Sequence, residues 1–216
     1  MLNNKRIREH LEFEMNLNLN QYKSIQNKHQ ILLDLEKRIS TFDFNIYKYK
    51  IEKTLISNIE QWGNTLSKIE AVPKLDALLF EYDTTWWKSR QAHAYGIYDW
   101  KSYKLSEEEV DLDLQYEILE ELEHHPSFLL EFYDSFSFLD DDDEIEKKYV
   151  LEDNEYWDLK GFDELHDFLY FKGCIAIHDV LIKLQKKGLF DQFNFRHQAM
   201  ILIGEHDMGE RCLLIV

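Results

Sequence analysis

The residues best suited to chemistry lie near the end of the chain, between two apolar runs. Three carboxylates and an imidazole occur within six positions: Glu205, His206, Asp207 and Glu210. Carboxylates and imidazoles are the usual general acids and bases of enzymes, and loop tips held by rigid strands often carry function. A metal-dependent or acid/base enzyme, with His166 or His197 brought near by folding, is therefore one hypothesis. A charged, solvated turn explains the same residues, because no nucleophile paired with a base is evident.

Motifs of high specificity are missing from the sequence. It contains no phosphate-binding loop, no dinucleotide fingerprint, no HExxH and no nucleophile elbow. Two carboxylate–histidine pairs, Glu121 with His124 and Asp163 with His166, have the helical spacing that two-metal bundles use. With 42 acidic residues in the chain, such pairs are expected by chance. We therefore expect neither a metal nor a cofactor.

A second set of candidates is suited to binding. Six large aromatic residues fall within eighteen positions: Trp86, Trp87, Tyr95, Tyr98, Trp100 and Tyr103. Basic side chains such as Arg90 are interleaved with them, a composition enriched in recognition surfaces. Core packing of a sheet is the competing explanation. Because successive side chains of an extended segment point to opposite faces, Trp86 and Trp87 cannot both be buried there, and at least one is a candidate surface anchor.

The negative charge is concentrated in one segment. The net charge is -17, and residues 106–163 alone contain 22 acidic and 3 basic residues, including the run Asp140, Asp141, Asp142, Asp143. We expect this run to be a solvated loop, since its charges repel one another. A polyanionic nucleic acid would be repelled by such a segment, whereas a basic protein would be attracted. Solubility alone is the competing explanation.

Helices must supply most of the scaffold, because the chain has only 2 prolines and 7 glycines. Apolar spacing predicts helices over residues 17–40, 44–70 and 162–187, and Gly188 is suited to cap the last of these. A capping box at Ser106 to Glu109 predicts another helix over 107–123.

Four short apolar runs predict strands over residues 75–83, 93–100, 199–206 and 211–216, and the last two form a hairpin. The expected fold is α+β, with an N-terminal helical hairpin and further helices packed on a small, largely antiparallel sheet. We expect a single domain over 1–216, divided into a helical part, 1–72, and a mixed part, 73–216. His178, beside the apolar stripe of the long helix, is expected to be a satisfied core histidine.

No window approaches the ~18 consecutive apolar residues of a membrane span, and the polar start does not resemble a signal region. We therefore expect a cytoplasmic protein without a membrane partner. Cys174 and Cys212 each lie in an apolar run, so both are expected to be reduced and unreactive.

Together these features favour a protein that binds and inhibits another protein. In being small, acidic, aromatic-rich and without catalytic motifs, the chain is similar to bacterial toxin-neutralising immunity proteins. The resemblance implies a basic toxin as partner, with an acidic surface that steers it and an aromatic anchor that holds it. Two alternatives remain at this stage: the enzyme described above, and a structural or oligomer-forming protein that uses the N-terminal helices.

Overall fold

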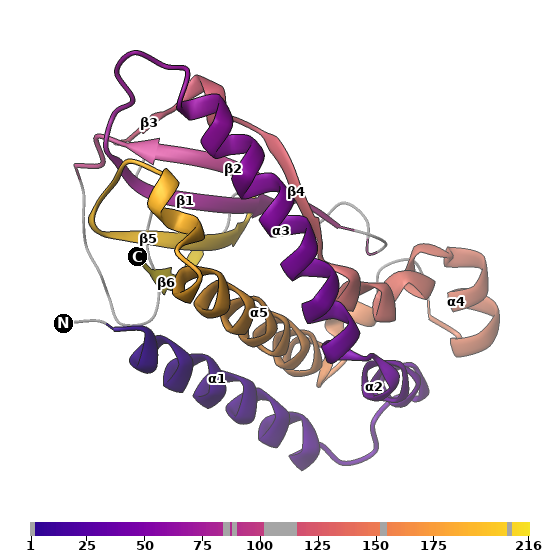
Figure 1. The fold of residues 1–216 in the computed structure, drawn as a ribbon. Coiled ribbons are helices and arrows are strands. Elements are labelled where there is room, and N and C mark those ends of the chain that lie inside the picture. The colour runs from indigo at the N-terminus through magenta and orange to yellow at the C-terminus, as the bar shows by residue number, and fades with distance from the viewer. Residues whose placement is uncertain (1–2, 84–86, 88–89, 102–115, 152–154, 207–208) are drawn as a thin grey trace.

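The fold is a six-stranded sheet with helices packed against one face (Figure 1). The computed structural model describes residues 3–83, 87, 90–101, 116–151, 155–206 and 209–216. The strands are β1 (Leu75–Tyr82), β2 (Gln91–Tyr98), β3 (Glu117–Ile118), β4 (His125–Leu129), β5 (Phe195–Glu205) and β6 (Glu210–Ile215). Their order is β3-β2-β1-β5-β6, with β4 also paired to β2.

Only the central pair, β1 and β5, is parallel; the other pairs are antiparallel. The helices are α1 (Asn4–Ser24), α2 (Gln30–Thr41), α3 (Phe44–Leu66), α4 (Asp142–Tyr149) and α5 (Phe162–Lys186). Short 3-10 turns link them: η1 (Glu120–Leu122), η2 (Glu131–Asp140), η3 (Glu155–Asp158) and η4 (Leu189–Gln192). The α+β class and the largely antiparallel sheet are confirmed, as are the four predicted strands and the 199–216 hairpin. Among the described residues, none of the helices combines the length and the hydrophobicity needed to cross a bilayer.

The first predicted helix, over 17–40, is instead two helices. Helix α1 begins much earlier, where the Asn3 side chain accepts a hydrogen bond from the Arg6 amide. It ends at Ser24, and Asn27 then adopts a left-handed φ of 54°, which asparagine tolerates better than most residues. Ile25 and Leu32 are seven positions apart, a spacing that fits a continuous helix, but a turn lies between them.

The predicted helix over 107–123 is wrong in the part that the structure describes. Residues 117–118 form strand β3, in which Ile118 lies opposite Ile97 of β2, and residues 120–122 form a 3-10 turn. Pairing with a strand edge has overridden the local helical pattern here. The Ser106 to Glu109 capping box lies outside the described residues.

Helix α5 matches its prediction and passes through the middle of the main core. Gly188 ends it with a left-handed φ of 71°, and its buried face contacts the sheet, α1 and α3. His178 is buried, and its Nδ1 lies 2.6 Å from the carbonyl oxygen of Leu213. Cys174 and Cys212 are free thiols, and burial raises the pKa of each to about 12, in keeping with the expected lack of reactivity.

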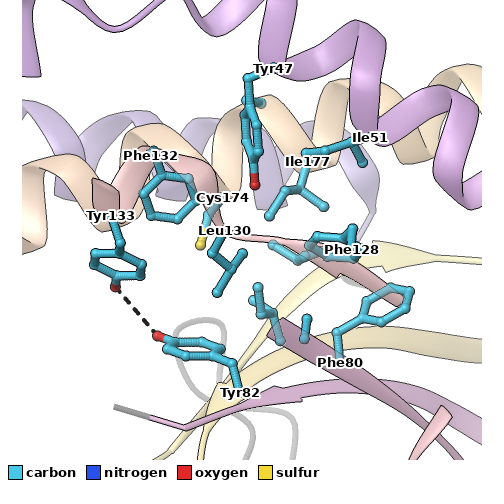
Figure 2. Close-up of a cluster of buried hydrophobic side chains, with 14 of the residues drawn as sticks. Tyr47, Ile51, Phe80, Tyr82, Phe128, Leu130, Phe132, Tyr133, Cys174 and Ile177 are labelled. Atoms are coloured by element: carbon cyan, nitrogen blue, oxygen red, sulfur yellow. Dashed lines mark hydrogen bonds between the residues drawn. The ribbon is translucent and has the colours of Figure 1, made fainter. Parts of the chain in front are cut away.

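The core between the helices and the sheet is rich in aromatic side chains (Figure 2). The Tyr47 ring meets the Phe132 ring edge-on at 5.6 Å between centroids, and Phe80 meets Phe128 in the same way at 5.0 Å. The hydroxyls of Tyr82 and Tyr133 lie 3.5 Å apart at one side of this core. These rings bring η2 and β4 against the sheet and α5.

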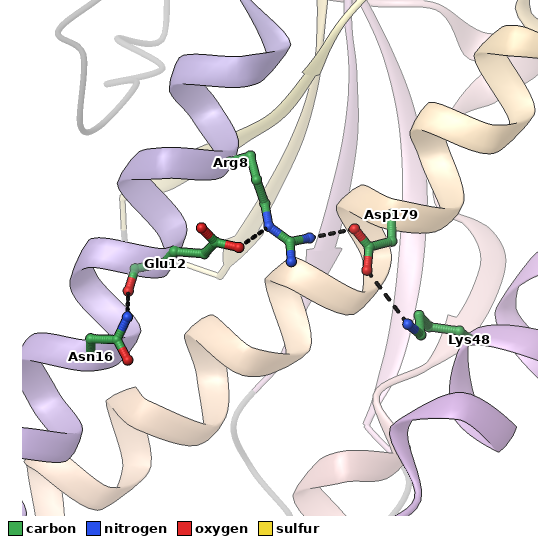
Figure 3. Close-up of polar contacts among 5 residues, drawn as sticks. All are labelled: Arg8, Glu12, Asn16, Lys48 and Asp179. Atoms are coloured by element: carbon green, nitrogen blue, oxygen red, sulfur yellow. Dashed lines mark hydrogen bonds and ion pairs between the residues drawn. The ribbon is translucent and has the colours of Figure 1, made fainter.

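On the solvent side, α5 is tied to both neighbouring helices by one carboxylate (Figure 3). Asp179 accepts a hydrogen bond from the Arg8 guanidinium of α1, and Lys48 Nζ of α3 lies 3.5 Å from its other oxygen. Arg8 also bonds Glu12 at 2.7 Å. The arrangement fixes α1 and α3 on either side of α5, although half-exposed ion pairs of this kind add little stability each.

Candidate functional site

The aromatic residues predicted to anchor a partner, and the arginine among them, are mostly buried. Trp87, Arg90 and Trp100 expose only 4%, 3% and 5% of their surfaces. Tyr98 is half-buried and packs against the main core, and Trp86 lies outside the described residues. Trp87 and Trp100 are therefore core residues, and neither is available as a surface anchor.

Arg90 is buried because aromatic rings surround it. Its guanidinium carbon lies 4.4 Å from the centroid of the Trp87 ring and 4.2 Å from that of Tyr133. Cation–π contacts strengthen when they are desolvated, and Arg suits them because its planar group stacks on rings. The arginine therefore belongs to the packing under the site and not to its surface.

The run from Asp140 to Glu144 is not the expected solvated loop, because Asp140 ends η2 and Asp141 to Glu144 begin α4. The Asp141 side chain caps α4 by accepting from the Glu144 amide at 3.0 Å. Asp142, Asp143 and Glu144 form the first turn, where negative charge complements the helix dipole. Asp140 accepts from the Trp87 amide at 3.3 Å. All five acidic residues are exposed.

An aromatic residue that the sequence analysis did not single out lies beside this helix. Trp157, in η3, is 42% exposed and stacks on the buried Trp87, with ring centroids 5.2 Å apart. Its neighbour Tyr156 is buried, and Asp140 and Asp142 are close enough to contribute to the raised pKa of that phenol, after burial itself. The signal available in the sequence was an aromatic pair inside an acidic segment.

Val150 is the second exposed apolar residue at α4. It terminates the helix with a left-handed φ of 59° and is 87% exposed. Glycine is the usual residue at such a position, since a β-branched side chain is strained there. We call the exposed residues Asp140 to Glu144, Val150 and Trp157 the α4 surface. Figure 1 shows α4 at the margin of the molecule, away from the sheet.

The hairpin residues Glu205, His206 and Glu210 do not form one constellation. The His206 Nδ1 lies 3.2 Å from a carboxylate oxygen of Glu81, whose side chain leaves the sheet on the face opposite the main helices. Glu210 lies opposite Gly204 in the ladder. Glu205, by alternation, faces the helices. Asp207 lies outside the described residues, and His197 is exposed near the start of β5.

Glu205 instead lines a pocket of about 170 Å³ between the ends of β1 and β5 and the first half of α5. The other lining residues are Tyr82, His166, Asp167, Tyr170, Phe171, Gly209 and Arg211. Tyr82 and Glu205 are direct neighbours because β1 and β5 are parallel and end together. Crevices at the carboxyl ends of parallel strands are common ligand sites.

Burial raises the pKa of the Glu205 carboxyl above its usual value, although the nearby Arg90 and His166 oppose the rise. His166, which the sequence analysis named as a residue that folding could add, is held among aromatic rings, with Tyr133 stacked at 5.5 Å. Its Nδ1 lies 3.2 Å from Asp167. An imidazole oriented by a carboxylate beside a second carboxyl of raised pKa is an arrangement suited to binding polar groups or moving protons.

The carboxylate–histidine pairs do not create a metal site. His124 is not helical, with φ 52°, and its ring stacks on His93 at 4.0 Å between centroids, so the helical spacing to Glu121 is lost. Within the described ranges no group of three or more His, Cys, Asp or Glu side chains could hold a metal ion.

Compared with known proteins, the chain matches no family model, no curated protein and no solved structure.

Proposed function

We propose that the chain is a cytoplasmic inhibitor or adaptor that binds a basic protein through the α4 surface. The single observation that carries the proposal is the position of Trp157, an exposed tryptophan stacked on buried Trp87, whose backbone amide donates a hydrogen bond to Asp140, the first of five consecutive exposed carboxylates. Aromatic residues supported by a rigid neighbour make good anchors because little conformational entropy is lost on binding.

Charge supports a basic partner in particular. Asp142, Asp143 and Glu144 are exposed at the start of one short helix, and residues 106–163, with 22 acidic and 3 basic residues, account for more than the whole net charge of -17. Charges at the rim of an interface act mainly on the rate of encounter. The toxin-neutralising immunity proteins that the composition resembles are the concrete form of this proposal, with a basic toxin as partner.

The strain at Val150 adds a separate argument. Residues held in unfavourable backbone conformations cluster at functional sites, where the surrounding structure maintains them. Here an almost fully exposed valine occupies a left-handed position at the other end of α4 from the acidic turn. An apolar contact with a partner would give such a residue a role that glycine cannot fill.

The experiment uses the purified product of the gene adjacent to the one for this chain. Association and dissociation rates are measured at low and high salt for wild type and for the triple variant Asp142→Asn, Asp143→Asn, Glu144→Gln. Asp140 and Asp141 are left intact because both accept hydrogen bonds from backbone amides. We expect the triple variant to associate about threefold or more slowly, with little change in dissociation, and added salt to have the same effect.

The matched control removes the same charge elsewhere, with Glu9→Gln, Glu60→Gln and Glu70→Gln. These glutamates are exposed on or near α1 and α3, away from α4, so their loss should leave association nearly unchanged at physiological salt. If both triple variants slow association equally, the carboxylates of the α4 surface act only through the net charge of the protein. An association rate indifferent to salt and to the α4 variant would contradict the proposal.

A further inference from the structure

The Glu205 pocket is separate from the α4 surface and carries an inference of its own. Its volume of about 170 Å³ equals that of about six water molecules at roughly 30 Å³ each. That is well below the several hundred Å³ of a typical drug-sized site. The pocket therefore suits a small molecule of the size of a free amino acid.

The charged groups of the pocket are divided between its two ends. Glu205 ends β5 beside Tyr82 and lies close enough to Arg90 and His166 for their charges to interact, although Arg90 itself does not line the pocket. Arg211 lies opposite Ile203, two residues before Glu205, and its guanidinium carbon is 5.5 Å from the Phe171 ring. Glu205 and Arg211 are therefore diagonal neighbours on one face of the sheet, a relationship that separates Cα atoms by about 7–8 Å. His166 and Phe171 are five residues apart in α5, which corresponds to about 7.5 Å along the helix axis.

Two of the lining residues are phenols. Tyr82 and Tyr170 both line the pocket, and burial holds the pKa of each hydroxyl well above its usual value. The phenols therefore stay neutral and can donate or accept hydrogen bonds. Asp167, about half exposed and 3.2 Å from His166, adds a second carboxylate at the Glu205 end.

We infer that the pocket binds a small zwitterion, a free amino acid or a molecule of like charge pattern. Its ammonium group would lie at Glu205 and Asp167, and its carboxylate at Arg211. A ligand with only a negative charge would meet the two carboxylates, and one with only a positive charge would meet Arg211. A zwitterion satisfies both ends, and Arg is well suited to a carboxylate because its planar fork can bond both oxygens.

The experiment is a ligand-observed NMR titration of the whole chain with glycine, L-alanine, L-serine and L-aspartate. We expect at least one to bind saturably, and its methyl ester and its N-acetyl derivative to bind more weakly, because each lacks one charge. Glu205→Gln and Arg211→Gln should each weaken the parent amino acid about tenfold or more, the size expected for losing a charged hydrogen bond. Arg211→Lys keeps the positive charge but loses the planar fork, so its affinity should fall between those of wild type and Arg211→Gln.

The matched control is Glu210→Gln, the other described glutamate of the same hairpin, which does not line the pocket and should bind as wild type. If Glu205→Gln does not fold, the comparison of parent, ester and N-acetyl derivative on wild type still decides. Absence of saturable binding by all four amino acids overturns the inference, as does equal binding of parent and both derivatives. The α4 variants should leave this binding unchanged, so the two proposals can fail separately.

Discussion

Trp157 stacks on Trp87 with ring centroids 5.2 Å apart and planes inclined by 29°. Trp87 in turn stacks on Phe136 at 4.8 Å, so the exposed indole rests on a column of buried rings. These packed rings restrict the movement of the exposed Trp157 side chain. Trp87, which the sequence suggested as an anchor, instead supports Trp157 from below and is buried itself.

Replacing Trp157 by alanine is expected to raise the dissociation rate of the basic partner. A buried aromatic anchor typically contributes about 2 kcal/mol or more, which is roughly a thirtyfold change in affinity. Trp157 also contacts the rings of Tyr156 and Phe162, so its loss should cost the fold more than the ~0.5–1.5 kcal/mol of a single aromatic pair. Binding kinetics and thermal melting of the same samples separate the two effects.

The control for Trp157 is Tyr49→Ala, which removes an aromatic side chain of 57% exposure from α3. It should change neither dissociation nor melting appreciably, since surface substitutions away from special features are usually neutral. A Trp157→Ala variant that melts lower but keeps the wild-type dissociation rate would show that the residue only packs.

Glu205→Gln should make stability less dependent on pH. Burial raises the pKa of the Glu205 carboxyl above its usual value, so between the usual and the raised pKa the folded protein binds more protons than the unfolded chain. The free energy of unfolding of wild type therefore falls as pH rises through this window. Glutamine does not titrate and avoids this loss.

The measurement is the melting temperature of both proteins at about pH 4, below the usual pKa of a glutamate, and at about pH 7.5, above it. The melting temperature of the variant, relative to that of wild type, should be higher at the higher pH. A difference in melting temperature that is the same at both pH values, or that moves the other way, would show that Arg90 and His166 compensate the carboxylate fully. Glu210→Gln serves again as the control.

Local signals predicted several elements well and failed where distant partners decide. Helix α5 and its Gly188 cap follow from spacing and a single glycine, because both are set within a few residues. The 117–118 segment could not be predicted in this way, since its strand exists only by pairing with β2. The turn at Asn27 was not predicted, because the apolar residues before and after it have the spacing of one continuous helix.

The site shows the same division. Alternation along an extended strand already implies that Glu205 and His206 point to opposite faces, so part of their separation was predictable. The contact of Glu205 with Tyr82 was not, because it requires β1 and β5 to be parallel neighbours across more than a hundred residues of chain. The burial of Trp87 likewise depends on η2, η3 and α5 meeting around it.

Gly173 should not tolerate alanine, whereas Gly63 should. A Cβ atom at Gly173 would lie 2.4 Å from the ring of Phe132, which is fully buried, so the ring or the helix must move. Overpacking of this kind costs about 1–3 kcal/mol. At Gly63 the obstacle is the end of the exposed Gln192 side chain, which can swing away.

Denaturant unfolding of the two variants tests the pair. Alanine is intrinsically better than glycine in a helix by about 1 kcal/mol, so Gly63→Ala should be neutral or more stable than wild type. Gly173→Ala should be less stable despite the same gain. Equal changes in both variants would mean that α5 and η2 are not packed as closely as the Phe132 contact requires.

Val150→Gly is expected to stabilise the fold and weaken the interaction with the partner. The substitution relieves a left-handed conformation, φ 59°, that costs a residue with a Cβ atom roughly 1–2 kcal/mol. It also removes an apolar side chain that is 87% exposed and so contributes little to the core. The melting temperature should therefore rise while the dissociation rate of the partner increases.

Val150→Ala provides the comparison, because alanine keeps part of the strain and loses most of the apolar surface. If Val150 contacts the partner, both variants should dissociate faster than wild type, and only the glycine variant should be clearly more stable. If Val150 were instead a residue without a role at the α4 surface, both variants would bind as wild type and the gain in stability would come without any loss. Binding kinetics measured on the three proteins at one salt concentration distinguish these outcomes, since the α4 charges are the same in all of them.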